Sequence, residues 1–200
     1  MELKNLPDIT FAESDPQTVE LNIVTTVEGL LGRKLARADP LRLFLRGIEA
    51  LMIQQRILID ETAKQNLLAF ATGDRLDHIG VLTGTDRIQP SAATTTVNLQ
   101  VSSARETATL IPKGTRVTAG DGVLFALDDA AVIEAGKTSV DARATCTVAG
   151  TKGNGYLPGE IDKLVDPVPF VAAAKNVTIS AGGADLEDDD SYRERIHEAP

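Results

Sequence analysis

The apolar residues of this chain change their spacing along its length. Over the first ~90 residues they recur every three or four positions, as on one face of an α-helix. Over the next ~90 residues apolar and polar residues alternate, as in strands with one buried face. Helical spacing returns over residues 192–198. Helical and strand segments that are separated in this way predict an α+β fold.

The first predicted helix begins near residue 15. Ser14 or Asp15 is the expected N-cap, because Pro16 then stands at the start of the helix, where its missing N–H costs nothing. At helical spacing, the residues that would form one apolar stripe are Val19, Ile23, Val27, Leu30 and Leu31.

The second predicted helix carries the strongest local pattern. Asp39 and Pro40 repeat the same start, and apolar residues follow at spacings of three, four and seven. These residues are Leu41, Phe44, Leu45, Ile48, Leu51, Met52, Ile59, Ala63, Leu67 and Phe70. If the helix continues unbroken to Phe70 it is about 46 Å long, whereas a compact chain of this length is only about 40 Å wide. We therefore expect it to cross the body or to protrude, and to bury its stripe on the first helix or on another chain.

A short third helix is expected after the long one. Gly73-Asp74 should end the long helix and cap the short one over residues 75–82, with Gly84 near its end. The spacing then changes over residues 87–90.

Alternation from Thr94 onward predicts an antiparallel β domain. Asp121-Gly122 lies between two apolar runs and predicts a hairpin turn. Further strands are expected over residues 138–148, 161–165 and 171–179, before Gly182-Gly183 ends the sheet. The apolar positions of the earlier strands are Val97, Leu99, Val101, Leu110, Ile111, Val117, Val123 and Phe125. Within residues 138–148, one face should carry Val140, Ala142, Ala144, Cys146 and Val148.

These patterns divide the chain into three parts. We expect a helical assembly arm over residues 1–90, an antiparallel β domain over residues 91–182, and the start of a helical segment over residues 183–200. Because the sequence ends where that last helix begins, we expect the chain to be a piece of a longer protein.

Composition and charge restrict the possible partners. Of the 200 residues, 42% are hydrophobic, which is enough for a substantial core. The formal charge of −9, from 29 acidic and 20 basic residues, repels phosphate backbones, so nucleic acid is not expected as a partner. Aromatic residues make up only 4%, which argues against a surface that stacks bases or sugars. No apolar run approaches the roughly 20 residues of a membrane helix, and no secretory signal is visible, so we expect synthesis and assembly in a cytoplasm.

Candidate binding sites all have simpler interpretations. The loop Gly150-Thr-Lys-Gly-Asn-Gly155 could cradle a phosphate, but it joins strand-like segments and lacks the Walker order, so a tight turn is expected. The acidic residues Asp185, Glu187, Asp188, Asp189 and Asp190 could hold calcium. Because they lack the EF-hand glycine and distal glutamate, helix capping is the favoured interpretation.

Residues that could catalyse a reaction are not arranged for it. His78 and His197 are far apart and have no metal-ligand spacing beside them. The place of Cys146 in an alternating run predicts a small buried hydrophobe, and the lack of a cationic partner argues against a reactive thiol. No Gly-x-Ser-x-Gly elbow occurs. We therefore predict no catalytic, cofactor-binding or metal-binding residues and no small-molecule substrate.

Several short motifs occur in a characteristic order. They are Ala38-Asp-Pro-Leu-Arg-Leu43, Asp60-Glu-Thr-Ala-Lys-Gln-Asn-Leu-Leu68, Ala71-Thr-Gly-Asp-Arg-Leu-Asp-His-Ile-Gly80, Ile111-Pro-Lys-Gly-Thr115, Gly150 to Gly155, and Gly182-Gly-Ala-Asp185 followed by Glu187, Asp189, Tyr192, Arg193 and Arg195. In this order they resemble the baseplate J-like family of contractile phage tails, which includes the J protein of P2-like phages and its Mu-like relatives. The resemblance covers nearly the whole chain.

The resemblance implies a structural role. Members of this family are wedge components that join copies of themselves and other wedge proteins into the ring around the tail tube, without a known enzymatic activity. It also implies a location in the virion, with assembly in the host cytoplasm. Family members usually continue past the helix that starts here at Tyr192. Two alternatives stay open: a carbohydrate or cell-surface binding module, suggested by the β segment and the acidic loop, and a cell-wall hydrolase carried by a tail.

Overall fold

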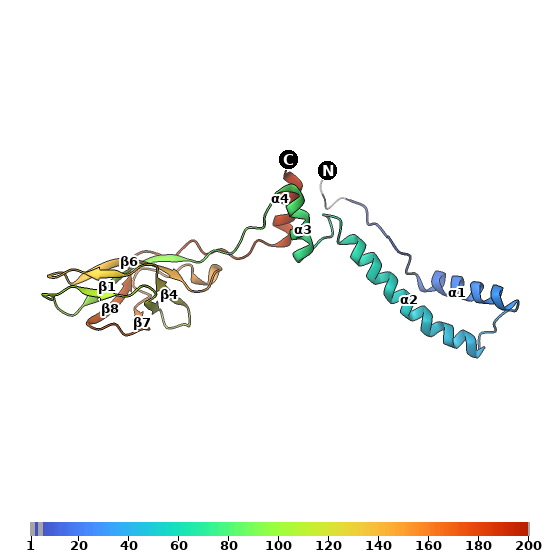
Figure 1. Cartoon of the computed structure of the whole chain (residues 1–200), viewed down its shortest axis with the longest axis horizontal. Coiled ribbons are helices and arrows are strands. Elements are labelled where there is room, and N and C mark those ends of the chain that lie inside the picture. The colour runs from blue at the N-terminus through green and yellow to red at the C-terminus, as the bar shows by residue number, and fades with distance from the viewer. Residues whose placement is uncertain (1–2, 4–5, 200) are drawn as a thin grey trace. The chain divides into compact units, whose positions relative to one another are not determined.

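The computed structural model describes residues 3 and 6–199, and within them the chain forms four helices and eight strands (Figure 1). The chain divides into two compact units. The first, called here the helical unit, comprises residues up to 86 together with residues from 189 onward. The second, the β unit, comprises residues 87–188. In sequence, the β unit is therefore inserted into the helical unit. The predicted α+β fold is confirmed.

Helix α1 (Pro16–Leu31) begins as the sequence predicts. The side chain of its N-cap Asp15 accepts a hydrogen bond from the backbone N–H of Thr18, and Gly32 ends the helix with a positive φ. Its predicted stripe is buried only in part. Val19 is buried, but Leu30 is 83% exposed.

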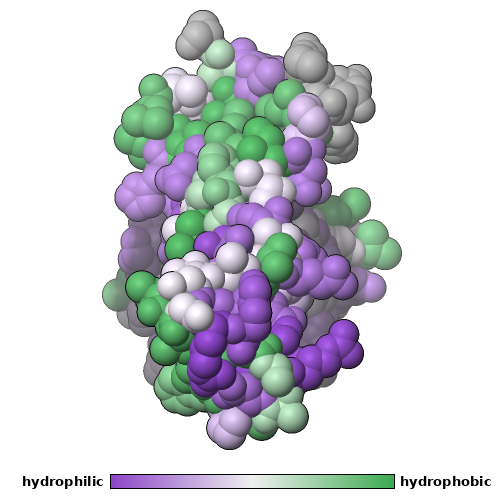
Figure 2. Space-filling model, turned by 90° about the vertical axis from the view of Figure 1, so that its right-hand side faces the viewer, coloured by the Kyte–Doolittle hydropathy of each residue, from purple (hydrophilic) through white to green (hydrophobic). Residues whose placement is uncertain are grey.

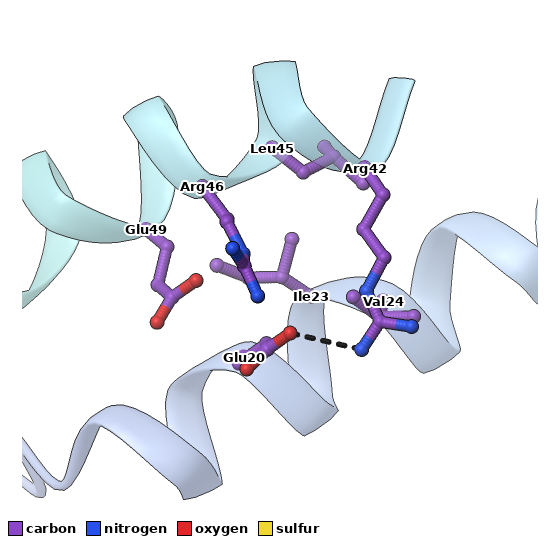
Figure 3. A pocket seen from close by; sticks show the side chains of 7 residues that line it. All are labelled: Glu20, Ile23, Val24, Arg42, Leu45, Arg46 and Glu49. Atoms are coloured by element: carbon purple, nitrogen blue, oxygen red, sulfur yellow. Dashed lines mark hydrogen bonds and ion pairs between the residues drawn. The ribbon is translucent and has the colours of Figure 1, made fainter. Parts of the chain in front are cut away.

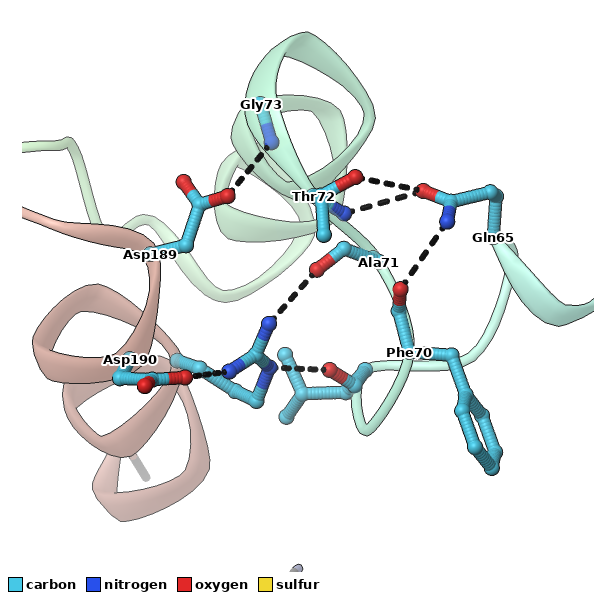
Figure 4. A network of polar contacts seen from close by, with 9 residues as sticks. Gln65, Phe70, Ala71, Thr72, Gly73, Asp189 and Asp190 are labelled. Carbon is cyan, nitrogen blue, oxygen red and sulfur yellow. Dashed lines mark hydrogen bonds and ion pairs between the residues drawn. The ribbon is translucent and has the colours of Figure 1, made fainter. Parts of the chain in front are cut away.

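Helix α2 (Pro40–Lys64) also has the predicted start, because the side chain of Asp39 accepts the backbone N–H of Leu41. It ends at Lys64, so the prediction of an unbroken helix to Phe70 is wrong, and its length is about 38 Å. The side chain of Gln65 explains the difference (Figure 4). Its amide donates to the carbonyl of Phe70 and accepts from the backbone N–H of Thr72, which holds the chain in turns between these residues.

Helices α3 (Gly73–Thr83) and α4 (Asp189–Glu198) pack together in the helical unit. The helices predicted over residues 75–82 and 192–198 are confirmed, although each begins earlier than expected. Their shared core contains Ala71, Leu76, Tyr192 and Ile196. From α4, the guanidinium of Arg193 donates to the carbonyls of Leu68 and Ala71 in the turn after α2.

The β unit is built from antiparallel strands. Its strands are β1 (Thr94–Val101), β2 (Thr109–Ile111), β3 (Arg116–Thr118), β4 (Leu124–Leu127), β5 (Ala131–Ile133), β6 (Ser139–Cys146), β7 (Lys163–Leu164) and β8 (Val171–Asn176). Six of them form one sheet in the order β7-β3-β4-β6-β1-β8, and β2 pairs with β5. The two end strands, β7 and β8, lie beside each other, so the sheet nearly closes into a barrel.

The predicted alternation places the core inside this barrel. Val97, Leu99 and Phe125 are fully buried, and Cys146 is buried as a small hydrophobe. The predicted turn at Asp121-Gly122 joins β3 and β4, which pair in the sheet. The prediction that Val148 lies on the buried face of the strand over residues 138–148 is wrong. This residue lies beyond the end of β6 and is 59% exposed, because the chain turns toward Gly150 and leaves the sheet.

The later strands are shorter than the alternation suggests. The predicted strand over residues 161–165 is reduced to β7, and β8 ends at Asn176 rather than at residue 179. Beside both strands the Asn176 side chain forms hydrogen bonds with the backbone: it accepts the N–H groups of Gly159 and Ile161 and donates to the carbonyls of Leu157 and Thr178. The short strand β5 was not predicted from the sequence.

Candidate protein-protein interface on the helical unit

Helix α2 turns its charged residues toward α1. The guanidinium of Arg42 lies 2.9 Å from the Glu20 carboxylate of α1, and Arg46 and Glu49 line the same small pocket (Figure 3). The hydrogen bond from Arg42 is the main reason that the pKa of Glu20 lies below its ordinary value. Val24 and Leu45 are the buried apolar residues of this pocket. The contact between the two helices is therefore largely polar.

An extended segment covers the same side of α2 farther along the helix. The carboxylate of Asp60 accepts the backbone N–H of Phe11 at 2.6 Å and that of Ala12 at 3.3 Å. One turn on, Lys64 bridges Asp60 and Asp8 at 3.1 and 3.2 Å. The hydrogen bond from Phe11 and then that from Lys64 lower the pKa of Asp60. Residues 8–13 thus continue the cover that α1 begins.

Replacing Asp60 with alanine should release this segment, because its carboxylate holds two backbone N–H groups. We expect the NMR amide shifts of Phe11 and Ala12 to move to values typical of disordered peptides. Since the pKa of Asp60 is lower in the folded chain than its ordinary 3.8, its contribution is complete above pH 3.8 and is lost as the pH falls further. The matched control is Glu61→Ala, at the neighbouring exposed position. Unchanged Phe11 and Ala12 shifts in Asp60→Ala would contradict the prediction.

The other side of α2 is apolar and uncovered. At 100° per residue, five large apolar side chains fall within an arc of about 100°. We call them the apolar face of α2: Phe44, Ile48, Leu51, Leu58 and Ile59, which are 66, 37, 63, 67 and 56% exposed. Figure 2 shows hydrophobic side chains exposed on one face of the molecule, among hydrophilic ones.

A groove extends this apolar surface toward α1. It has a volume of about 290 Å³, with the lining residues Val19, Asn22, Ile23, Thr26, Val27, Met52 and Arg56. Met52 stands four residues after Ile48, so the two side chains are neighbours on the helix surface. The apolar face and the groove together offer a continuous surface on which apolar side chains of another protein can pack.

Helix α2 is therefore oriented in the opposite way to an amphipathic helix of a monomer: its charged side faces other segments of the chain and its apolar side is exposed. An amphipathic helix in a soluble protein normally turns its apolar side to the core and its charged side to water. In α2 the charged side chains of Arg42, Arg56, Asp60 and Lys64 contact α1 or residues 8–13, while the apolar face meets solvent. Fully burying one such side chain contributes roughly 1.5–3 kcal/mol. Covering the apolar face is thus strongly favourable, which is the property of a protein-protein interface.

The predicted acidic cluster serves the fold of the chain. The carboxylate of Asp185 accepts the backbone N–H and the hydroxyl of Thr151. The carboxylate of Asp189 accepts the backbone N–H of Gly73 (Figure 4). Asp189 and Asp190 lie in the first turn of α4, as the capping interpretation predicts. Among the residues that the structure describes, no group of three or more His, Cys, Asp and Glu side chains could hold a metal ion.

The two glycine-rich motifs, residues 150–155 and Gly182-Gly183, contact each other in the β unit. Asn154 donates to the carbonyl of Gly183 at 2.7 Å and accepts its backbone N–H at 2.9 Å. A Cβ on Gly183 would collide with the carbonyl oxygen of Gly150, so this approach requires glycine. The backbone N–H of Thr151, which a phosphate would need, is bonded to Asp185. The sequence revealed both motifs but not that they pack on each other.

The remaining candidate residues lie apart. His78 is exposed on α3, and His197 is exposed in the last turn of α4. Burial and then a hydrogen bond to Asp121 raise the pKa of Tyr156 to about 12. That hydrogen bond ties the loop after β6 to the β3–β4 turn. The groups with shifted pKa values thus take part in contacts that hold the fold.

Comparison with known protein families identifies both parts of the chain. Residues 39–94 match the model of the baseplate J-like N-terminal domain, and residues 96–183 match that of the baseplate J-like protein barrel domain. The chain belongs to the baseplate J-like family. It is therefore a structural component of a phage baseplate. The family models cover α2, α3 and the barrel, and α2 carries the apolar face described above.

A solved structure is also similar to this baseplate J-like chain. In the cryo-EM structure of the anti-feeding prophage (AFP) baseplate, 6-fold symmetrised, a chain with 12% sequence identity matches with a TM-score of 0.45. The match covers 89% of this chain and 50% of that chain, so this chain spans about half its length. No curated protein sequence matches significantly. None of the helices in the described part of the chain is long and apolar enough to cross a membrane.

Proposed function

We propose that this baseplate J-like chain is a wedge component of a contractile tail baseplate, and that it binds other wedge proteins and copies of itself through the apolar face of α2. The observation that carries the proposal is the orientation of α2: Arg42, Asp60 and Lys64 on one side bind α1 or residues 8–13, while the apolar face on the other side stays in solvent. A chain that acts in this way belongs in the virion and assembles in the host cytoplasm.

The proposed role needs rigid contacts and no chemistry. The ion pair and hydrogen bonds on the charged side of α2 hold α1 and residues 8–13 in place. They leave the apolar face free for another protein. We therefore propose a function without catalysis, cofactor or small-molecule substrate. The acidic loop that suggested a carbohydrate-binding module is engaged in hydrogen bonds to the chain itself, so we do not favour that alternative.

The double substitution Leu51→Lys and Leu58→Lys tests the proposal. Both side chains are at least 63% exposed, so the free chain should fold with unchanged stability. Two lost leucine contacts of roughly 1.5–3 kcal/mol each should weaken association at least about 100-fold. Mass spectrometry of baseplates purified from producing cells measures incorporation, and light scattering over a dilution series measures self-association.

The matched control adds the same two charges elsewhere on α2. Ala50→Lys with Gln54→Lys changes two exposed residues of the same helix, outside the arc of the apolar face. This control should enter baseplates like the parent chain. Normal incorporation of the Leu51 and Leu58 double variant would contradict the proposal, and loss of both double variants would show a general effect of charge.

A further inference from the structure

One turn of the β unit has an unusual residue at a position that favours glycine. The backbone N–H of Val171 donates to the carbonyl of Val168, and Pro169 and Phe170 lie between them. Phe170 has a φ of 72°, the one positive φ of a non-glycine residue in the described part of the chain. Proline second and a positive φ third is the pattern of a type II turn, in which the third residue is normally glycine.

The phenylalanine side chain is not used to fill the core. It is 62% exposed, so burial does not compensate for the strained backbone that it requires. Instead, the guanidinium of Arg105 stacks on its ring, 3.4 Å from the ring centre. The turn therefore presents a fixed aromatic ring with a cation against it.

Arg105 carries a charge that the chain does not neutralise. Its one hydrogen bond from Nη1 reaches the hydroxyl of Thr109 at 3.4 Å, and among the described residues no carboxylate pairs with it. Two other cations of the β unit do have carboxylate partners: Lys137 pairs with Glu134, and Arg116 pairs with Asp166.

We propose that Arg105 and Phe170 form a second docking site, through which the β unit binds a carboxylate-bearing segment of a neighbouring baseplate protein. Arginine and aromatic residues dominate binding at protein interfaces, and the guanidinium N–H groups match a carboxylate in geometry and charge. The stack holds both side chains in place before binding, which reduces the entropy that association costs. Backbone strain at Phe170 fits a binding site, where such outliers concentrate. This inference rests on the proposed baseplate function but uses a different surface.

Photo-crosslinking of the full chain in producing cells tests this site. Phe170→p-benzoylphenylalanine should crosslink in assembled baseplates to a peptide of another chain that contains Asp or Glu. The same substitution at Leu51 reports on the apolar face of α2. Crosslinks at position 51 without any at position 170 would overturn this inference and leave the proposed function standing. Absence of crosslinks at both positions would overturn both.

Two variants then separate binding from folding. Arg105→Glu should reduce incorporation at least about tenfold, and lysine at the mapped partner acid should restore it. Failure of that charge swap would overturn the inference. Phe170→Gly removes the strain together with the ring, so it should melt within a few degrees of the parent and still lose incorporation. A marked drop in melting temperature with normal incorporation would instead assign Phe170 to the fold. Leu157→Ser, at a residue that is 54% exposed, is the control and should change neither property.

Discussion

Replacing Asn176 with leucine is expected to destabilise the β unit by about 3–4 kcal/mol, although the two side chains have similar volumes. Asn176 is 2% exposed. Its amide accepts the backbone N–H groups of Gly159 and Ile161 at 2.9 and 3.0 Å, and donates to the carbonyls of Leu157 and Thr178 at 2.9 and 3.0 Å. These bonds fasten the segment before β7 to the end of β8, where the sheet closes.

The size of the effect follows from the groups that leucine leaves behind. Each lost bond costs about 1 kcal/mol net, and a buried donor without a partner costs about 1–3 kcal/mol. The carbonyls of Leu157 and Thr178 keep other donors, but within the described part of the chain the backbone N–H of Ile161 has no other acceptor. For a unit of about 100 residues this corresponds to a fall of at least about 12 °C in melting temperature.

Chemical and thermal unfolding of the full chain measure this change. Asn98→Leu is the matched control, because Asn98 lies on β1 in the same sheet, but its side chain bonds at the surface to Asp141. We expect the control to cost less than about 1 kcal/mol. Equal losses in both variants would mean that Asn176 does not fasten the barrel.

Local signals in the sequence predicted the places where elements begin. Asp15 and Asp39, each followed by proline, cap α1 and α2 as expected, because capping depends only on residues a few positions apart. The β3–β4 turn at Asp121 has the same local character. The end of α2 was not predictable in this way, because Gln65 reaches forward to Phe70 and Thr72 only once the turn has formed.

The sequence predicted the apolar residues of the candidate interface but not which side of the helix is exposed. Spacing identified Phe44, Ile48, Leu51 and Ile59 as part of an apolar stripe, and the family resemblance suggested a structural role. Periodicity cannot say which side of a helix its neighbours cover, because that depends on contacts such as those of Arg42 with Glu20 and of Asp60 with Phe11. The sequence therefore suggested a helix that binds another surface, and the contacts in the structure show which side of the helix is exposed to solvent.

Contacts between distant segments account for most of what the sequence left out. Arg193 bonds to carbonyls 122 and 125 residues earlier in the chain. Asn154 and Gly183 pair across 29 residues. Such pairs leave no periodic signal, and a motif such as Gly182-Gly183 shows only that a close approach or a turn is needed somewhere. The Arg105–Phe170 stack was missed for the same reason.

Replacing Gly80 with alanine is expected to separate α4 from α3. A Cβ at this position would collide with the hydroxyl of Tyr192 and would lie 2.6 Å from the carbonyl oxygen of Thr85. That carbonyl accepts the hydrogen bond of the Tyr192 hydroxyl, also at 2.6 Å. Because both partners occupy the space that the methyl group needs, neither can move without breaking the contact. The tyrosine ring must therefore leave its site.

The cost should be among the largest of any single substitution in the helical unit. Tyr192 is 1% exposed and is the largest side chain in the core that α3 and α4 share. Losing its burial and its hydrogen bond should destabilise this packing by roughly 3 kcal/mol or more. The Arg193 bonds to the turn after α2 depend on the same docking, so α4 should detach as a whole.

Hydrogen exchange measured by mass spectrometry can detect this detachment, as lost protection of the backbone amides of α4 with unchanged protection in β1 and β6. Gly29→Ala is the matched control, because Gly29 lies in α1 and a Cβ there meets no atom within 4 Å. That change should stabilise its helix by up to about 1 kcal/mol. Full protection of α4 in Gly80→Ala would mean that α3 shifts to admit the methyl group, and that Tyr192 does not require glycine opposite it.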